Sequence, residues 1–316
     1  MSIPTLQADR IDPNDLCRAL SESGCFRLRH PLLPPERLNE VLNDARAFFA
    51  LPQAVKSAIA IEHSQHFRGY SEMKNERDWR EQLHLGAERA SPEDEPAFLQ
   101  LEGPNLWPPD PAWRDRILRY LAEGVEVGKQ VLANVCSGLG IESDCFADKA
   151  GLDPYVVMKL ICYHPQPEIN KYRPGVAAHV DFSWITLTLQ DDTGGLEVRG
   201  PDGRWLAVEP EPGTVLVHVG EILAFATKGR FPATPHRVIN HRFDRSRVSI
   251  PLFLNPSLHT VVSQVPGIAD GQTRALDDTH IHRVIATETT GDPFLFGPAE
   301  WRRKGLNVWC TECVKE

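Results

Sequence analysis

The chain has 316 residues, 41% of them hydrophobic and 24% charged, which is ordinary for a globular protein and excludes wholesale disorder. Its net charge of −9 argues against a nucleic-acid partner and against an anionic membrane surface, because both favour a basic protein face. No apolar run reaches the ~18 residues that a membrane span requires, and the first ten residues lack the basic leader and apolar stretch of a signal peptide. We therefore expect a cytoplasmic protein with a small-molecule ligand and no membrane partner. Its oligomeric state is not readable from the sequence.

The seven cysteines are odd in number and widely spread, unlike a disulfide framework. Several lie in apolar stretches, which is typical of buried thiols in a reducing compartment. Cys310 and Cys313 have the C-x-x-C spacing, but no second pair accompanies them. We interpret them as two tail thiols rather than as a zinc or redox site.

Helices are expected first along the chain. The Pro34-Pro35 pair opens a helix whose apolar residues, from Leu38 to Phe49, recur at helical spacing, and Leu51-Pro52 ends it. A longer helix is predicted over residues 113–137, although Gly124 and Gly128 are weak helix formers. These helices and some short β-like pieces make residues 1–150 a mixed N-terminal region.

From about Tyr155 the pattern changes to short strands rich in β-branched residues, separated by glycine and proline turns. The predicted strands cover residues 156–163, 184–190, 196–199, 214–219 and 247–254. Many short strands at this spacing favour a double-sheet jelly roll. We assign an α+β fold with a double-stranded β-helix (jelly-roll) core over 151–262 and flanking N-terminal helices. Residues 263–316 are interpreted as a C-terminal cover segment, and the three regions as one integrated domain.

The pattern that carries most chemistry is His179-Val180-Asp181 followed by His236. Alternate residues of a strand face the same side, so His179 and Asp181 can enter one cavity from a single segment. His236, from another strand, completes a set of two imidazoles and one carboxylate, which leaves half of an octahedral metal shell open. Such a facial triad typically holds non-haem Fe(II) for O2 activation. His241 is the competing third ligand, and His218, in the middle of a predicted strand, is assigned a structural role.

Arg247 and Ser249 are also two residues apart and therefore share one strand face. An arginine directed into a jelly-roll cavity is a buried charge that needs an anion. Its planar fork, with the neighbouring hydroxyl, suits the far carboxylate of a dicarboxylic acid such as 2-oxoglutarate. The competing interpretation is an ordinary surface strand with a solvated arginine.

Further motifs appear in a fixed order along the chain: Gly24-Cys-Phe-Arg-Leu28, Arg68-Gly-Tyr70, Tyr163-His-Pro-Gln-Pro-Glu168, the run Leu187–Leu196, Pro235-His-Arg-Val238 and Asn255-Pro256. Together with the triad and the Arg-x-Ser pair, this series resembles the isopenicillin N synthase family of iron- and mostly 2-oxoglutarate-dependent dioxygenases. The resemblance covers roughly residues 15–260.

The resemblance implies that His179, Asp181 and His236 are the iron ligands and catalytic centre. It also implies that Arg247 and Ser249 clamp the C5 carboxylate of 2-oxoglutarate.

Tyr163 or His164 is then expected near that cosubstrate. Many family members carry Asn-Tyr-Tyr-Pro where this chain has Cys162-Tyr163-His164-Pro165, so the third cosubstrate contact stays open between the two.

The sequence indicates the substrate-binding residues less clearly than the metal and cosubstrate residues. Arg68, Tyr70, Glu81, His84 and Trp184 fall in regions that can face the cavity, and each has a structural interpretation beside the functional one. Of these, Arg68, Tyr70 and Trp184 are our candidates for substrate binding, Trp184 because its bulk near the iron ligands would narrow the pocket.

The implied reaction uses Fe(II), O2 and 2-oxoglutarate to oxidise a small metabolite by hydroxylation, desaturation or cyclisation, with release of succinate and CO2. A role in secondary metabolism is expected. One alternative is an oxidase that uses Fe(II) and O2 without 2-oxoglutarate, since such family members also carry the Arg-x-Ser pair. Two further alternatives are a non-catalytic relative that binds a small acid and a hydrolase or isomerase using another divalent metal.

Overall fold

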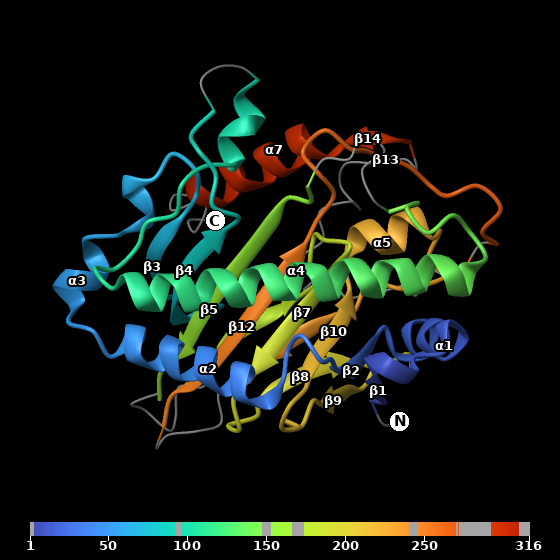
Figure 1. Cartoon of the computed structure of the whole chain (residues 1–316), viewed down its shortest axis with the longest axis horizontal. Coiled ribbons are helices and arrows are strands. Elements are labelled where there is room, and N and C mark those ends of the chain that lie inside the picture. The colour runs from blue at the N-terminus through green and yellow to red at the C-terminus, as the bar shows by residue number, and fades with distance from the viewer. Residues whose placement is uncertain are drawn as a thin grey trace.

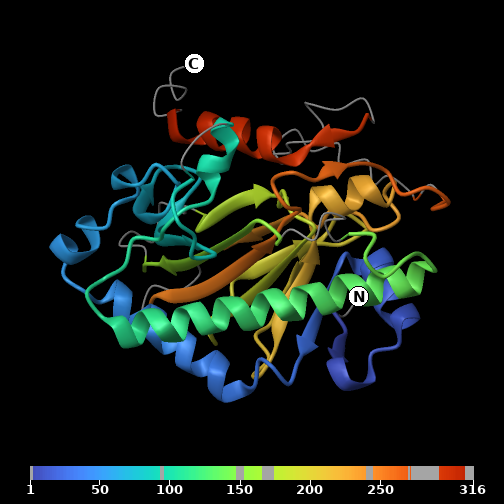
Figure 2. The same cartoon turned by 45° about the horizontal axis from the view of Figure 1, so that its top comes forward.

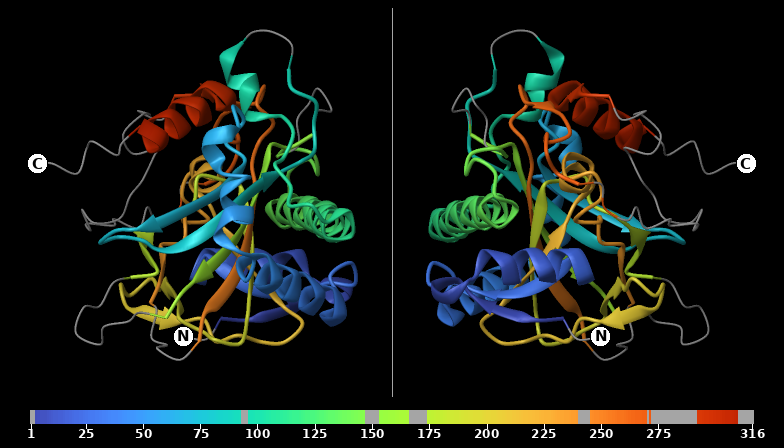
Figure 3. Two further views of the ribbon diagram at one scale, coloured as in Figure 1. Left: turned by 90° about the vertical axis from the view of Figure 1, so that its left-hand side faces the viewer. Right: turned by 90° about the vertical axis from the view of Figure 1, so that its right-hand side faces the viewer.

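The computed structural model describes residues 3–92, 96–146, 153–165, 174–239, 245–269, 271 and 292–309, with the backbone alone for 305–309. Its strands form an eight-stranded sheet, a four-stranded sheet and a two-stranded ribbon. Helices cover one face of the large sheet, and the small sheet lies on the other side (Figure 1; Figure 3). This arrangement confirms the predicted α+β fold with a jelly-roll core and flanking helices.

The eight-stranded sheet has the order β1 (Thr5–Gln7), β2 (Cys25–Arg29), β10 (Val215–Val219), β7 (Ile185–Gln190), β12 (Arg247–Leu254), β5 (Val156–Tyr163), β4 (Trp79–Gly86) and β3 (Gly69–Lys74). The four-stranded sheet has the order β6 (Val176–His179), β11 (His236–Val238), β8 (Leu196–Arg199) and β9 (Trp205–Ala207). The ribbon pairs β13 (Val261–Val262) with β14 (Phe294–Leu295). Strands from the predicted N-terminal region thus belong to the same sheet as the core strands, while the boundaries at 150 and 262 stay predictions.

The helices are α1 (Pro13–Ser23), α2 (Pro35–Phe49), α3 (Gln53–Ser57), α4 (Pro111–Leu139), α5 (Glu221–Ala226) and α7 (Phe296–Trp309), with short 3-10 turns η1 (Ala8–Arg10), η2 (Ile61–His63) and η3 (Ala97–Leu101). The two long helices predicted from the sequence correspond to α2 and α4. None of the helices in the described ranges is long and apolar enough to cross a bilayer.

Helix α4 crosses the large sheet (Figure 1), and Gly124 and Gly128 within it let it approach the sheet closely. A Cβ atom at Gly124 would lie 2.8 Å from Leu252 Cδ1, and one at Gly128 would lie 2.9 Å from Leu254 Cδ2. Carbon atoms in contact are normally about 3.5–4.0 Å apart. The weak helix formers are therefore explained by packing against β12.

Strand register divides the large sheet into a helix-facing and an inward face. Arg247 is paired with Tyr163, and Ser249 with Ile161, so these side chains share one face. Ile161 and Tyr163 pack with Val238 of β11 in an apolar cluster between the two sheets. Residues of opposite parity, such as Leu252, pack instead in the larger core under the helices. The Arg-x-Ser pair therefore lies inside the jelly roll.

Candidate iron and cosubstrate site

The small sheet brings the three predicted metal ligands together. His179 ends β6 and is the Cα partner of His236, which begins β11, and Asp181 follows two residues after His179. The Oδ1 atom of Asp181 is 3.6 Å from His179 Nε2 and 3.7 Å from His236 Nε2. The three ligand atoms all lie within 4.8 Å of one another. This spacing is compatible with one metal ion bound by all three side chains.

The backbone sets the orientation of both imidazoles. His179 Nδ1 is 2.9 Å from the carbonyl oxygen of Ala177, and His236 Nδ1 is 3.0 Å from that of Thr234. A carbonyl accepts only, so each Nδ1 carries the proton and each Nε2 presents a lone pair toward Asp181. Burial, with His236 nearby, lowers the pKa of His179 to about 3, which keeps that imidazole in the neutral form that metals bind.

The side chain of Asp181 is kept ionised, and one of its two oxygens is held by a hydrogen bond. Burial alone would raise its pKa, but His236, His218 and His179, with the Thr186 hydroxyl, lower it below the usual range. The Thr186 hydroxyl donates to Asp181 Oδ2 at 2.6 Å, which leaves Oδ1 directed to the two imidazoles. His218 Nδ1 is 3.6 Å from the same Oδ2 atom. His218 therefore packs behind the triad, in line with its predicted structural role.

Arg247 lies on the inward face of β12 and is only 2% exposed. Its Nε donates to the Gly194 carbonyl at 2.7 Å, and one Nη to Gln190 Oε1 at 3.2 Å. The other terminal nitrogen, Nη1, is buried and has no hydrogen-bond partner among the described residues. A buried guanidinium with a free donor needs an acceptor, and a carboxylate would supply one. Ser249 is buried on the same face and has Gln190 as its Cα partner on β7.

The two candidates for the third cosubstrate contact lie on opposite faces of the sheet. The Arg247 guanidinium lies over the Tyr163 ring, 5.0 Å from its centroid. His164 points to the helix-facing side, where it binds the Glu81 carboxylate and lies 3.4 Å from Ser246 Oγ. The structure thus brings Tyr163 to Arg247, and it does not bring His164 there.

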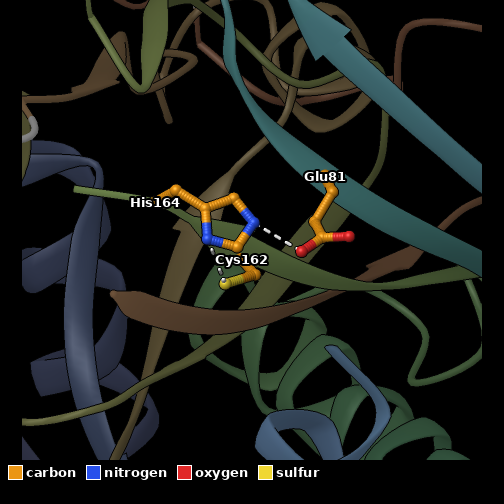
Figure 4. Close-up of side chains that lie close together, drawn as sticks. All are labelled: Glu81, Cys162 and His164. Atoms are coloured by element: carbon orange, nitrogen blue, oxygen red, sulfur yellow. Dashed lines mark hydrogen bonds and ion pairs between the residues drawn. The ribbon is translucent and has the colours of Figure 1, made fainter. Parts of the chain in front are cut away.

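A second group of side chains that could bind a metal consists of Glu81, Cys162 and His164 (Figure 4). Both carboxylate oxygens of Glu81 already accept strong hydrogen bonds: Oε1 from His164, and Oε2 from Lys56 Nζ at 2.6 Å and Tyr70 OH at 2.7 Å. A cation would have to compete with the Lys56 ammonium for the same oxygen. We therefore interpret this group as a buried ionic network that fastens α3 to β4 and β5.

The candidate substrate residues do not gather at the triad. Tyr70 belongs to the Glu81 network, and Trp184 packs on Phe146 with ring centroids 5.2 Å apart. Arg68 is buried and donates to the carbonyl oxygens of His66 and Leu101. His241, Cys310 and Cys313 lie outside the described residues.

Sequence reasoning missed the residues that support the ligands. Thr186 and Gln190 lie on the inward face of β7, where the first donates to Asp181 and the second accepts from Arg247. Both occupy alternate positions of a predicted strand, so the strand pattern of the sequence places them on one face. Their partners, however, depend on which strands are neighbours.

Two family models match the chain. The model described as the 2OG-Fe(II) oxygenase superfamily matches residues 154–256, and the model described as the N-terminal region of a non-haem dioxygenase in morphine synthesis matches residues 13–110. The first match contains the triad, the Arg-x-Ser pair and the strands that carry them.

Individual proteins agree with the family models. A curated 2-oxoglutarate-Fe(II) type oxidoreductase from Emericella nidulans is 32% identical over 261 residues, covering 77% of this chain and 74% of the relative. Among solved structures, a putative 2OG-Fe(II) oxygenase family protein from Caulobacter crescentus is 25% identical with a TM-score of 0.78, covering 96% of this chain and 99% of that one. A dioxygenase for auxin oxidation from rice has a TM-score of 0.72 at 25% identity, with 97% and 96% coverage, and supports the same fold.

Proposed function

The chain belongs to the 2OG-Fe(II) oxygenase superfamily, and on that premise we propose the roles of the individual residues in its site. The protein is an Fe(II)- and 2-oxoglutarate-dependent dioxygenase, an oxidoreductase that acts on a small molecule. We assign His179, Asp181 and His236 as the iron ligands. Arg247 and Ser249 are assigned to the C5 carboxylate of 2-oxoglutarate, with Tyr163 beside them.

The observation that carries the iron assignment is the arrangement of donor atoms around Asp181 Oδ1. Two imidazole nitrogens whose rings are fixed by backbone carbonyls face one ionised carboxylate, all within 4.8 Å. Two imidazoles and one carboxylate on one face are the donor set of non-haem Fe(II) oxygenases. With iron bound there, 2-oxoglutarate and O2 are converted to succinate and CO2 while the substrate is oxidised.

The residues of this chain supply position and environment for that chemistry. Thr186 keeps one carboxylate oxygen of Asp181 occupied so that the other faces the metal. Arg247 is fixed by Gly194 and Gln190, and its buried Nη1, which has no partner among the described residues, is available to an anion. A charge-assisted hydrogen bond in such a site orients the cosubstrate by both geometry and charge. Relatives whose names state a 2-oxoglutarate-dependent reaction favour that reaction over the oxidase and the non-catalytic alternatives.

Anaerobic equilibrium dialysis against Fe(II) tests the iron assignment. We expect wild type to bind one Fe(II) per chain and Asp181→Asn to lose it, because the amide presents no charge to the metal. His164→Gln serves as the matched control, since it alters the other group with metal-ligand spacing. Retention of iron by Asp181→Asn, or loss of iron only in His164→Gln, would contradict the assignment.

We extend the proposal to a cytoplasmic enzyme of secondary metabolism with no nucleic-acid or membrane partner. Cys17, Cys136 and Cys162 are free thiols, which suits a reducing compartment, and the net charge is −9. The N-terminal family model refers to morphine synthesis. Cell fractionation, and comparison of metabolites from cells with wild type or Asp181→Asn, would test these two points.

A further inference from the structure

Two basic side chains without partners lie side by side on the inward face of the large sheet. His84 on β4 and Lys159 on β5 are Cα partners. His84 is 9% exposed, and both of its ring nitrogens are buried without a hydrogen-bond partner in the described part of the chain. Lys159 Nζ lies 5.4 Å from the centroid of the Phe253 ring, and no described residue forms a salt bridge or hydrogen bond with it.

This pair faces the same interior as the iron centre. Lys159, Ile161 and Tyr163 alternate on one face of β5, and that face also carries Arg247 and Ser249 from β12. Phe253, which Lys159 contacts, is the Cα partner of Thr186, the residue that donates to Asp181. From β7 to β5 there are two strand spacings, roughly 10 Å. Lys159 therefore lies on the inward face two strands from the strand that carries Thr186.

The cosubstrate pocket does not account for the pair. Lys159 is four residues from Tyr163 along β5, roughly 13 Å at the rise of a strand. A ligand held by Arg247 beside Tyr163 leaves Lys159 and His84 without an anion. These two side chains mark a separate position on the inward face.

The surroundings are rich in positive charge. Arg80 of β4 and Arg303 and Lys304 of α7 act electrostatically on His84 or Lys159, as does Arg68. The carboxylates paired with them are Asp78, 3.1 Å from Arg80, and Glu300, which binds Arg303 at 2.5 Å and is 4.0 Å from Lys304. Asp181 also acts on Lys159, and among the described residues of this group the basic side chains outnumber these three carboxylates. Figure 2 shows α7, which carries Arg303 and Lys304, lying across one end of the strands.

Burial and nearby positive charge weaken the protonation of Lys159. Burial, followed by Arg80 and Arg303, lowers the Lys159 pKa to about 7. Burial and Lys159 also lower the His84 pKa well below its ordinary value. An anion bound between them would favour the charged ammonium and accept a hydrogen bond from either side chain.

We propose that the substrate of this enzyme is a small organic acid whose carboxylate is held by Lys159 and His84. The carbon to be oxidised then lies within roughly 10 Å of that carboxylate, since the acid spans from β5 to the triad. This inference rests on the proposed function, because it takes the iron centre as the other end of the substrate.

Anaerobic titration calorimetry on the protein loaded with Fe(II) and saturating 2-oxoglutarate tests the proposal. Saturation fills the Arg247 pocket, so that an added acid reports on the second position. The probes are benzoate, phenylacetate and hexanoate, each compared with its primary amide. We expect at least one acid to bind roughly tenfold to a hundredfold more tightly than its amide, as a hydrogen bond to a charged group implies.

Lys159→Met should abolish that preference, because it keeps the length of the side chain and removes the charge. Lys129→Met is the matched control, since Lys129 is exposed on α4 and 3.8 Å from Asp153. The visible charge-transfer band of the Fe(II)–2-oxoglutarate complex, recorded on every sample, shows that the site is loaded. Three results would overturn this inference and leave the proposed function standing. They are equal binding of acid and amide, a preference for the acid that survives in Lys159→Met, and no binding of any acid to a loaded site. Absence of the band in wild type would instead overturn the proposed function, and this inference with it.

Discussion

Glu81→Gln should destabilise the protein strongly although Glu81 lies on the face of the sheet away from the iron site. The carboxylate is 2% exposed and binds Lys56, Tyr70 and His164, and the Lys56 side chain is itself only 8% exposed. Removing one partner of a buried ion pair leaves an uncompensated charge, which costs about 3–5 kcal/mol. At roughly 2.1 cal/mol/K per residue this corresponds to a fall in Tm of about 5–8 °C.

Urea unfolding followed by circular dichroism measures this loss. Glu72→Gln is the control, because Glu72 pairs with Lys74 on the exposed edge strand β3 and should change the unfolding free energy by less than about 0.5 kcal/mol. The double variant Glu81→Gln, Lys56→Met should recover most of the loss, since the deeply buried Lys56 charge is removed together with its partner. A loss under about 1 kcal/mol in Glu81→Gln, or no recovery in the double variant, would refute this account of the network.

Three further predictions concern stability and metal binding. Hydrogen bonds that the His164 imidazolium makes to Cys162 and Glu81 raise the His164 pKa to about 10, so its stabilisation is full below the ordinary value of 6.5 and is lost as pH rises through about 10. Wild type should therefore have a higher unfolding free energy than His164→Gln at pH 6, and this difference should vanish above pH 10. A difference that does not change with pH would contradict the assignment of the stabilisation to the charged His164. Thr186→Val should weaken Fe(II) binding about 10- to 100-fold in anaerobic dialysis, because Asp181 loses the donor that orients it, and unchanged affinity would argue otherwise. Phe296→Ala should lower the free energy of unfolding by about 3–5 kcal/mol, since this fully buried ring packs on Phe182, whereas a loss under about 1 kcal/mol would mean that α7 contributes little there.

The part of the site that the sequence predicts is the part built from residues two apart on one strand. Strand periodicity alone places His179 with Asp181 and Arg247 with Ser249 on common faces. The structure brings the first pair to His236 and buries the second beside Tyr163. The extents of β5 and β12 follow from composition as well, because both strands are buried and rich in β-branched residues.

The rest of the site depends on which strands are neighbours in the sheets, and no local sequence pattern contains that information. Strand pairing places Tyr163 beside Arg247, and His164 then lies on the helix side with Glu81. The pairing of His84 with Lys159 likewise requires β4 to lie next to β5, although more than seventy residues separate the two in the chain. Long-range contacts of this kind also explain why Tyr70 and Trp184 are found in packing rather than at the triad.

We propose that this iron centre takes 2-oxoglutarate through Arg247. The most direct measurement is anaerobic titration of the Fe(II) protein with 2-oxoglutarate, followed by its visible metal-to-ligand charge-transfer band. We expect the band in wild type, its loss in His179→Ala, and an affinity roughly a hundredfold weaker in Arg247→Met, which removes the buried charge. Arg245→Met, which alters an exposed arginine paired with Asp192, should titrate as wild type does. A band in His179→Ala, or wild-type affinity in Arg247→Met, would contradict the account.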